Sequence, residues 1–149
     1  MQSSVNFSSA RLLVIIAFLA IAGIAVSSVS LWHHYSPSKT SFCDFGEEFN
    51  CDIVNKSEYS TILGVPVSLI GILGYAGVLA FATFYRSQPN SPTILFCGAL
   101  AGLFFALYLT YIEAFVLSVW CILCLSSLFV IFCIAVLSLI AMAQQRRSN

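Results

Sequence analysis

Two pairs of cysteines are the residues of this sequence best suited to chemistry. Cys43 and Cys51 are separated by seven residues, and Cys121 and Cys124 form a Cys-Ile-Leu-Cys motif. The spacing of the second pair is typical of thiol–disulfide exchange centres, and on a helix it places both sulfur atoms on one face. If the motif opens a helix, the free N–H groups and the helix dipole there favour the nucleophilic thiolate.

The wider pair, taken alone, would be explained by a structural disulfide, because paired cysteines in an oxidising compartment usually form one. A second pair on the same side of a membrane favours a redox relay instead. Cys43 and Cys51 would then exchange disulfides with a soluble protein. Cys121 and Cys124 would pass two electrons to a hydrophobic carrier, for which a quinone is the obvious candidate.

Metal and haem centres fit the sequence less well. A four-cysteine zinc site usually contains two close pairs, and this chain has one C-x-x-C motif. His33 and His34 are the only histidines, and no C-x-x-C-H motif occurs, so haem ligands are lacking. Cys97 and Cys133 lie alone in apolar segments, where we expect them to pack as small apolar side chains. We therefore predict no metal ligand.

The composition requires a membrane. Of the 149 residues, 60% are hydrophobic and 8% are charged, and the mean hydropathy is +0.97. A soluble domain carries about 25% charged residues, so this chain cannot cover a soluble surface. The same numbers exclude a free cytosolic enzyme, a disordered chain and a nucleic-acid-binding protein with a basic face.

Apolar runs predict an all-α membrane protein with four transmembrane helices in one domain, residues 1–149. Between residues 93 and 143 the chain carries a single charge, that of Glu113. As one helix this run would reach roughly 75 Å, more than twice the hydrocarbon thickness of about 30 Å, so it must turn back, near residues 117–119. The predicted spans are residues 12–31, 65–85, 93–116 and 119–143, and the predicted redox loop is 32–64.

The arginines predict the orientation of these spans. With four spans, all of the arginines fall on one side of the membrane, whereas the acids other than Glu113 fall on the other side. The positive-inside rule then places both termini in the cytoplasm and the redox loop outside the cell (inner) membrane. The first span could instead be a cleavable signal peptide, but its apolar run exceeds the usual 7–15 residues. The arginines are Arg11, Arg86, Arg146 and Arg147.

The order of the cysteine pairs, with two further segments, resembles the vitamin K epoxide reductase (VKOR) family in its prokaryotic, disulfide-forming branch. The segments are Ser-Glu-Tyr-Ser-Thr-Ile-Leu-Gly-Val-Pro-Val-Ser-Leu-Ile-Gly at 57–71 and Tyr-Leu-Thr-Tyr-Ile-Glu at 108–113. The resemblance extends from the first predicted span to the last. It implies a four-helix bundle around a quinone (ubiquinone, menaquinone or a related molecule), with the loop or a short helix covering the quinone site.

The resemblance also implies roles for the four cysteines. Cys43 and Cys51 would be the shuttle pair that reoxidises a thioredoxin-fold partner. Cys121 would form a transient disulfide with Cys51, and Cys124 would face the quinone. Many members carry the partner as a fused domain. Because this sequence ends at Asn149, we expect a separate extracytoplasmic protein to supply it.

Two positions depart from the vertebrate members of that family. Leu128 stands where they have a tyrosine, and Ser60 stands where they have an asparagine, so reduction of vitamin K epoxide is disfavoured. We expect Ser60 either to donate a hydrogen bond to a quinone carbonyl or to serve as a helix-end hydroxyl. Glu113 is expected to relay protons to the quinone, unless it is an ordinary interfacial acid. A quinone-epoxide reductase and a non-enzymatic tetraspan protein with a structural disulfide remain the alternative functions.

Overall fold

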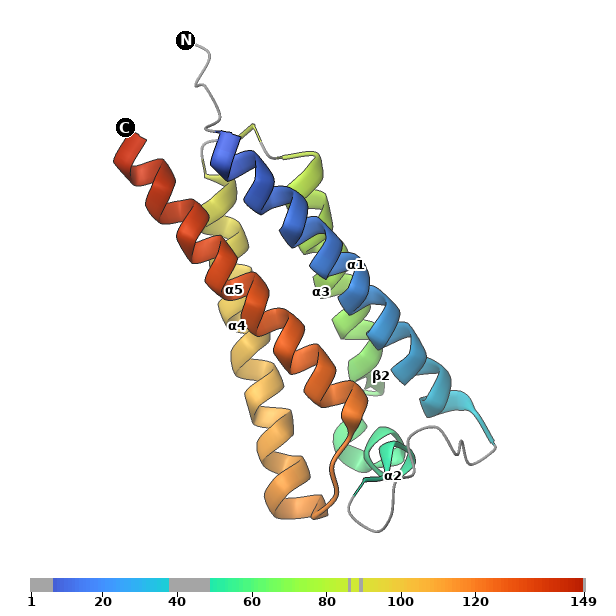
Figure 1. The fold of residues 1–149 in the computed structure, drawn as a ribbon. Helices are drawn as coiled ribbons and strands as arrows, with labels where there is room; N and C mark the ends of the chain where they lie inside the picture. The colour runs from blue at the N-terminus through green and yellow to red at the C-terminus, as the bar shows by residue number, and fades with distance from the viewer. Residues whose placement is uncertain (1–6, 38–48, 86, 89, 149) are drawn as a thin grey trace.

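The computed structural model describes residues 7–37, 49–85, 87–88 and 90–148, and four long helices dominate it (Figure 1). These helices are α1 (Phe7–Tyr35), α3 (Val67–Thr83), α4 (Ser91–Ile112) and α5 (Ile122–Ser148). Shorter elements lie between them: helix α2 (Cys51–Lys56), the 3-10 turn η1 (Glu58–Ser60), strands β1 (Thr61–Ile62) and β2 (Val65–Pro66), and the π-helical turn η2 (Glu113–Leu117).

Within the described residues, three helical segments are long and apolar enough to cross a membrane. They are Ala10–Tyr35, Ser91–Leu117 and Ile122–Arg147, and each has 26 or 27 residues. Helix α3 is also apolar, but it has only 17 residues. The prediction of a helical membrane protein is confirmed at this level.

The long helices pack side by side along most of their length (Figure 1). Helix α1 lies against α3 and α5, and α4 lies against α5. Their common core contains small and branched side chains, among them the fully buried Ile16, Ala20, Ala99 and Ile134. Small residues let helix backbones approach closely in lipid, where van der Waals packing drives helix association.

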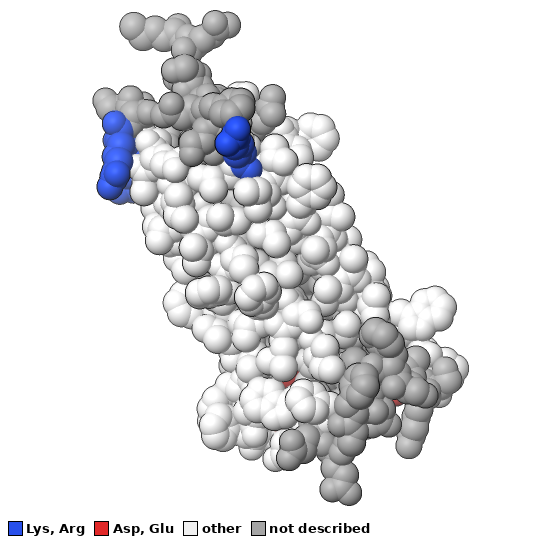
Figure 2. All heavy atoms as spheres, in the orientation of Figure 1, with Lys and Arg blue, Asp and Glu red and all other residues white. Residues whose placement is uncertain are grey.

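Charge is separated along the bundle. Arg11 lies near the start of α1, and Arg146 and Arg147 lie in the last turn of α5. Figure 2 shows basic side chains at this end of the molecule and acidic atoms close to the opposite end. The opposite end carries α2, the β1–β2 hairpin and η2, which together form a cap on the bundle (Figure 1).

The cap is attached to α1 through two histidines. Helix α1 extends four residues beyond the predicted first span, to Tyr35. In this extension, His33 Nδ1 lies 3.2 Å from Asp52 Oδ1 on α2. The neighbouring His34 Nδ1 forms a hydrogen bond with the backbone oxygen of Asn55, also on α2. The first residues of the predicted redox loop are therefore helical and hold the short helix in place.

A glycine allows the close contact between α1 and α3. A Cβ atom at Gly23 would lie 2.5 Å from carbon atoms of the Tyr75 ring. The Tyr75 hydroxyl donates a hydrogen bond of 2.9 Å to the backbone oxygen of Ser127, which ties α3 to α5. The position of this ring therefore depends on the missing side chain at residue 23.

We expect Gly23→Ala to destabilise the protein by about 1–3 kcal/mol, the usual cost of overpacking a core. The displaced ring would also lose its hydrogen bond to Ser127. The midpoint of thermal unfolding in detergent measures the effect. Gly77→Ala is the matched control, because nothing lies within 4 Å of the Cβ position there. Equal midpoints for the two variants would contradict the assignment.

Candidate active site

The backbone brings the loop cysteine next to the C-x-x-C motif. Phe49 and Trp120 form a parallel β-bridge, in which Asn50 N donates to Trp120 O at 3.1 Å. Cys51 directly follows Asn50, and Cys121 directly follows Trp120. The Asn50 side chain also accepts from Ile53 N at 3.1 Å and so caps α2, which begins at Cys51.

Cys51 and Cys121 pack in one buried cluster. Their exposed fractions are 1% and 0%, and the cluster also contains Val54, Val119 and Leu123. Cys51 is disulfide-bonded, whereas the other cysteines that the structure describes are free thiols: Cys97, Cys121, Cys124 and Cys133. Cys43 lies outside the described residues, so its role stays a prediction.

The C-x-x-C motif opens a helix, as expected. Leu125 N donates to the backbone oxygen of Cys121 at 3.0 Å, so Cys121 directly precedes α5 and Cys124 lies in its first turn. A hydrogen bond from the Cys124 thiol lowers the pKa of the Cys121 thiol. The backbone N–H groups of Cys124 and Leu123 add to this effect, and they outweigh burial and the nearby carboxyl of Glu113, which raise it. Cys121 is therefore the more acidic thiol expected at a helix start.

Glu113 is buried against the two thiols. Its exposed fraction is 2%, and its Oε2 accepts from Cys121 N at 3.0 Å. The chain reverses at Ser118, which has a left-handed backbone (φ 52°), and this reversal returns the motif to Glu113. A carboxylate oxygen of Glu113 and the sulfur atoms of Cys121 and Cys124 all lie within 4.8 Å of one another. Atoms of these types could bind a thiophilic metal cation. The same arrangement also suits a redox-active pair of thiols with a carboxyl group beside it.

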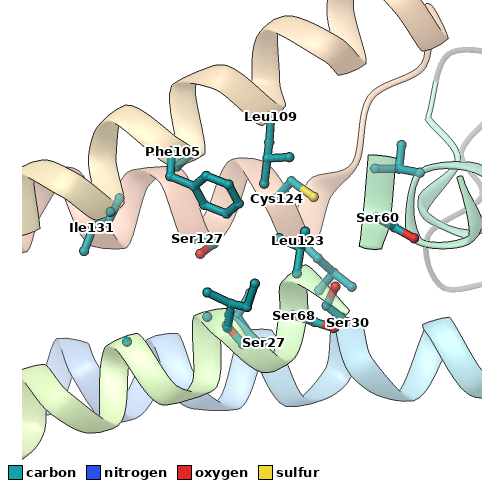
Figure 3. A pocket seen from close by; sticks show the side chains of 18 of the residues that line it. Ser27, Ser30, Ser60, Ser68, Phe105, Leu109, Leu123, Cys124, Ser127 and Ile131 are labelled. Carbon is teal, nitrogen blue, oxygen red and sulfur yellow. The ribbon is translucent and has the colours of Figure 1, made fainter. Parts of the chain in front are cut away.

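A cavity of about 380 Å³ lies between the long helices and the cap. Figure 3 shows Ser30, Ser60 and Cys124 toward one end of this cavity, with the Cys124 sulfur exposed to it. Phe105 and Ser127 lie further along the cavity, and the apolar Ile131 lies at its other end (Figure 3). The cavity is thus amphipathic, and one reactive thiol opens into its polar end.

The structure brings together most of the residues singled out from the sequence. Ser60, Glu113 and Cys124 line the cavity, while Cys51 and Cys121 pack together in the buried cluster next to it. Ser60 Oγ donates to Ser57 O at 2.7 Å, which is the helix-end interaction that the sequence left open. Cys97 and Cys133 are not among the lining residues.

Two features of the site could not be seen in the sequence. Glu113 was singled out, but its burial and its hydrogen bond from the C-x-x-C backbone were not expected. Asn55 was not singled out, although it is buried and lines the cavity. A polar residue four positions after Cys51 carries no signal of its own, because its burial depends on the packing of α2 against α1.

Comparison with known families agrees with these features. A model of the vitamin K epoxide reductase family matches residues 14–139, which is most of the chain. The matched region contains the cap, the C-x-x-C motif and the greater part of each long helix. The family consists of membrane oxidoreductases, and the apolar helices and neighbouring cysteines are consistent with that class. The chain belongs to the vitamin K epoxide reductase family.

Proposed function

We propose that the protein is a quinone-dependent thiol–disulfide oxidoreductase that drives disulfide bond formation. Cys43 and Cys51 reoxidise a separate thioredoxin-fold protein outside the cytoplasm. Cys121 and Cys124 then pass the two electrons to a quinone. The observation that supports this most strongly is the continuous path from the disulfide-bonded Cys51, through Cys121, to a thiol that opens into a cavity.

A fourth membrane span is part of the proposal. As an α-helix, the 17 residues of α3 extend about 26 Å, which approaches the hydrocarbon thickness of about 30 Å. Four spans would place both termini on one side, together with Arg11, Arg146 and Arg147. By the positive-inside rule that side is the cytoplasm, and the cap then faces the exterior of the cell (inner) membrane.

The cavity suits a quinone. Its volume of about 380 Å³ falls within the range of roughly 300–1,000 Å³ typical of small-molecule sites. Its polar end would receive the ring with its carbonyl oxygens, and its apolar end would receive part of the hydrophobic tail. When bound, a quinone accepts two electrons and two protons.

The first proposed step takes place at the loop disulfide. Because Cys51 is buried, we expect the partner's thiolate to attack the sulfur of Cys43. A mixed disulfide forms between the partner and Cys43, and Cys51 leaves as a thiolate. The partner's second thiol then displaces Cys43, so the partner leaves oxidised and the loop pair has gained two electrons.

The second proposed step transfers these electrons to the C-x-x-C pair. The Cys51 thiolate attacks Cys121 in the Cys121–Cys124 disulfide, and Cys124 leaves as a thiolate facing the cavity. Cys43 then attacks Cys51, which restores the loop disulfide and releases Cys121. The cysteine states described here, with Cys51 bonded and Cys121 and Cys124 free, match the end of this step.

Glu113 is proposed to hold the proton that accompanies the electrons. Its carboxyl group is close to both thiols, and its Oε1 has no hydrogen-bond partner among the described residues. Loss of the thiol protons and their delivery at the cavity require a group that exchanges protons within a dry site. A buried carboxyl group beside the reacting sulfurs meets that requirement.

A coupled assay tests the proposal. Purified protein in detergent is mixed with a reduced thioredoxin-fold protein and a short-chain quinone. We expect one quinone to be consumed for each disulfide formed in the partner. Supplying a quinone epoxide instead distinguishes the epoxide reductase alternative. Partner oxidation without quinone consumption would contradict the proposed acceptor, and no thiol oxidation at all would contradict the proposed class of enzyme.

A further inference from the structure

The side chain of Asn55 is buried with one polar group unused. Its residue is 6% exposed, and it lines the cavity beside Ser30 and Ser60. Nδ2 has no hydrogen-bond partner among the residues that the structure describes. Buried amide groups are almost always paired, because an unpaired donor loses its hydration without compensation. Because Asn55 lines the cavity, its unpaired Nδ2 suggests a ligand there that accepts the hydrogen bond.

Helix α1 fixes the orientation of this amide. Ser30 Oγ donates to Asn55 Oδ1 at 2.7 Å. The backbone oxygen of Asn55 is hydrogen-bonded to Nδ1 of His34, which lies one helical turn after Ser30 on α1. In this orientation Oδ1 accepts from Ser30 and Nδ2 keeps its two N–H groups, while shifting α2 would break the bond to His34. The free N–H groups are thus held in place before any ligand arrives.

Three neighbouring hydroxyl groups are already committed to protein acceptors. Ser60 Oγ donates to Ser57 O at 2.7 Å, and Ser57 Oγ donates to Val54 O at 2.8 Å. The Ser30 hydrogen is used by Asn55 itself. The donor role that the sequence offered to Ser60 is therefore better filled by Asn55, whose Nδ2 has hydrogens to spare.

We propose that Asn55 Nδ2 donates a hydrogen bond to a carbonyl oxygen of the quinone and so positions the ring at the polar end of the cavity, where the Cys124 sulfur lies. This inference rests on the proposed function. A neutral amide donor suits an uncharged carbonyl acceptor, and a preformed donor favours binding because no side chain must be reordered. Asn55 therefore binds and positions the quinone.

Two substitutions separate the donor from the rest of the side chain. Asn55→Leu removes the amide at similar volume, and Asn55→Asp keeps an acceptor for Ser30 but removes Nδ2. We expect both to raise KM for the quinone about tenfold, the usual effect of losing one hydrogen bond to a ligand. Exchange between the partner and the loop disulfide, followed by rapid alkylation, should keep its wild-type rate.

Infrared spectroscopy adds a readout that a merely structural role would not change. With a carbonyl-labelled quinone bound to the wild-type protein, we expect a C=O stretch at lower frequency than in free quinone. In Asn55→Leu the band should return toward the free value. Asn90→Asp is the matched control for Asn55→Asp, because Asn90 lies before α4 at the opposite end of the bundle, and it should leave both the band and KM unchanged.

The outcomes distinguish this inference from the function on which it rests. A wild-type protein that reduces no quinone contradicts both. If the wild type is active, an unchanged KM or an unchanged carbonyl band in Asn55→Leu overturns the role of Asn55 alone. Equal losses in quinone reduction and in partner exchange would indicate a folding defect and would also overturn it.

Discussion

Replacing Cys124 with alanine should reduce the rate of quinone reduction by roughly a thousandfold or more, as expected when a reacting thiol is lost. Cys124 is the thiol that opens into the cavity, and no other described cysteine lines it. Without this thiol the C-x-x-C pair cannot return to its disulfide, so turnover stops. The decrease in quinone absorbance with time measures the effect.

The same variant should contain a detectable disulfide between Cys51 and Cys121. Cys121 can still attack Cys51 in the neighbouring cluster, and without Cys124 the linked product can be resolved only by Cys43, which returns the protein to its starting state. Peptide mapping under non-reducing conditions would detect the linked peptides. Cys97→Ala and Cys133→Ala are the controls, because neither residue lines the cavity, and both should retain wild-type rates. Quinone reduction at the wild-type rate in Cys124→Ala would refute the relay.

Glu113→Gln should lower kcat for quinone reduction by about 10²- to 10⁴-fold, the range typical of a lost general acid or base. Glutamine can still accept the hydrogen bond from Cys121 N, which is 3.0 Å from Glu113 Oε2. The backbone reversal should therefore persist, while proton transfer beside the thiols is lost. Stopped-flow measurement of quinone reduction by the prereduced protein isolates this half-reaction.

Glu113→Asp is the matched control for the carboxyl group. It keeps an ionisable side chain but shortens it, so we expect a rate between those of the wild type and Glu113→Gln. The rate of thiol–disulfide exchange between the partner and the loop should be equal in all three proteins, because Glu113 takes no part in that exchange. A wild-type kcat in Glu113→Gln would mean that the acid serves only to hold the Cys121 backbone.

Much of this protein could be predicted from local sequence features. A long apolar run indicates that a segment is surrounded by lipid, so the helical membrane fold follows from composition and length. The C-x-x-C spacing reports its chemistry directly, and the order of the cysteine pairs indicated the family that the comparison confirms. These features require no knowledge of which segments meet in space.

The remaining features depend on contacts between distant segments. The pairing of Phe49 with Trp120 joins residues 71 positions apart, and no local pattern indicates it. The burial of Glu113 depends on the reversal at Ser118, which turns an acid at the end of a span into part of the thiol cluster. The free amide of Asn55 becomes evident only when each hydrogen bond around it is accounted for.

Burial of the junction between the loop and the last helix has a consequence for fidelity. Because Cys51 and Cys121 are buried, small thiols outside the cell membrane would not reach the transient disulfide that we propose between them. In the proposed relay, electrons that enter at the loop would then leave only through the cavity. The hydrophobic packing around Cys51 and Cys121 would in that relay also prevent a futile cycle of oxidation and reduction.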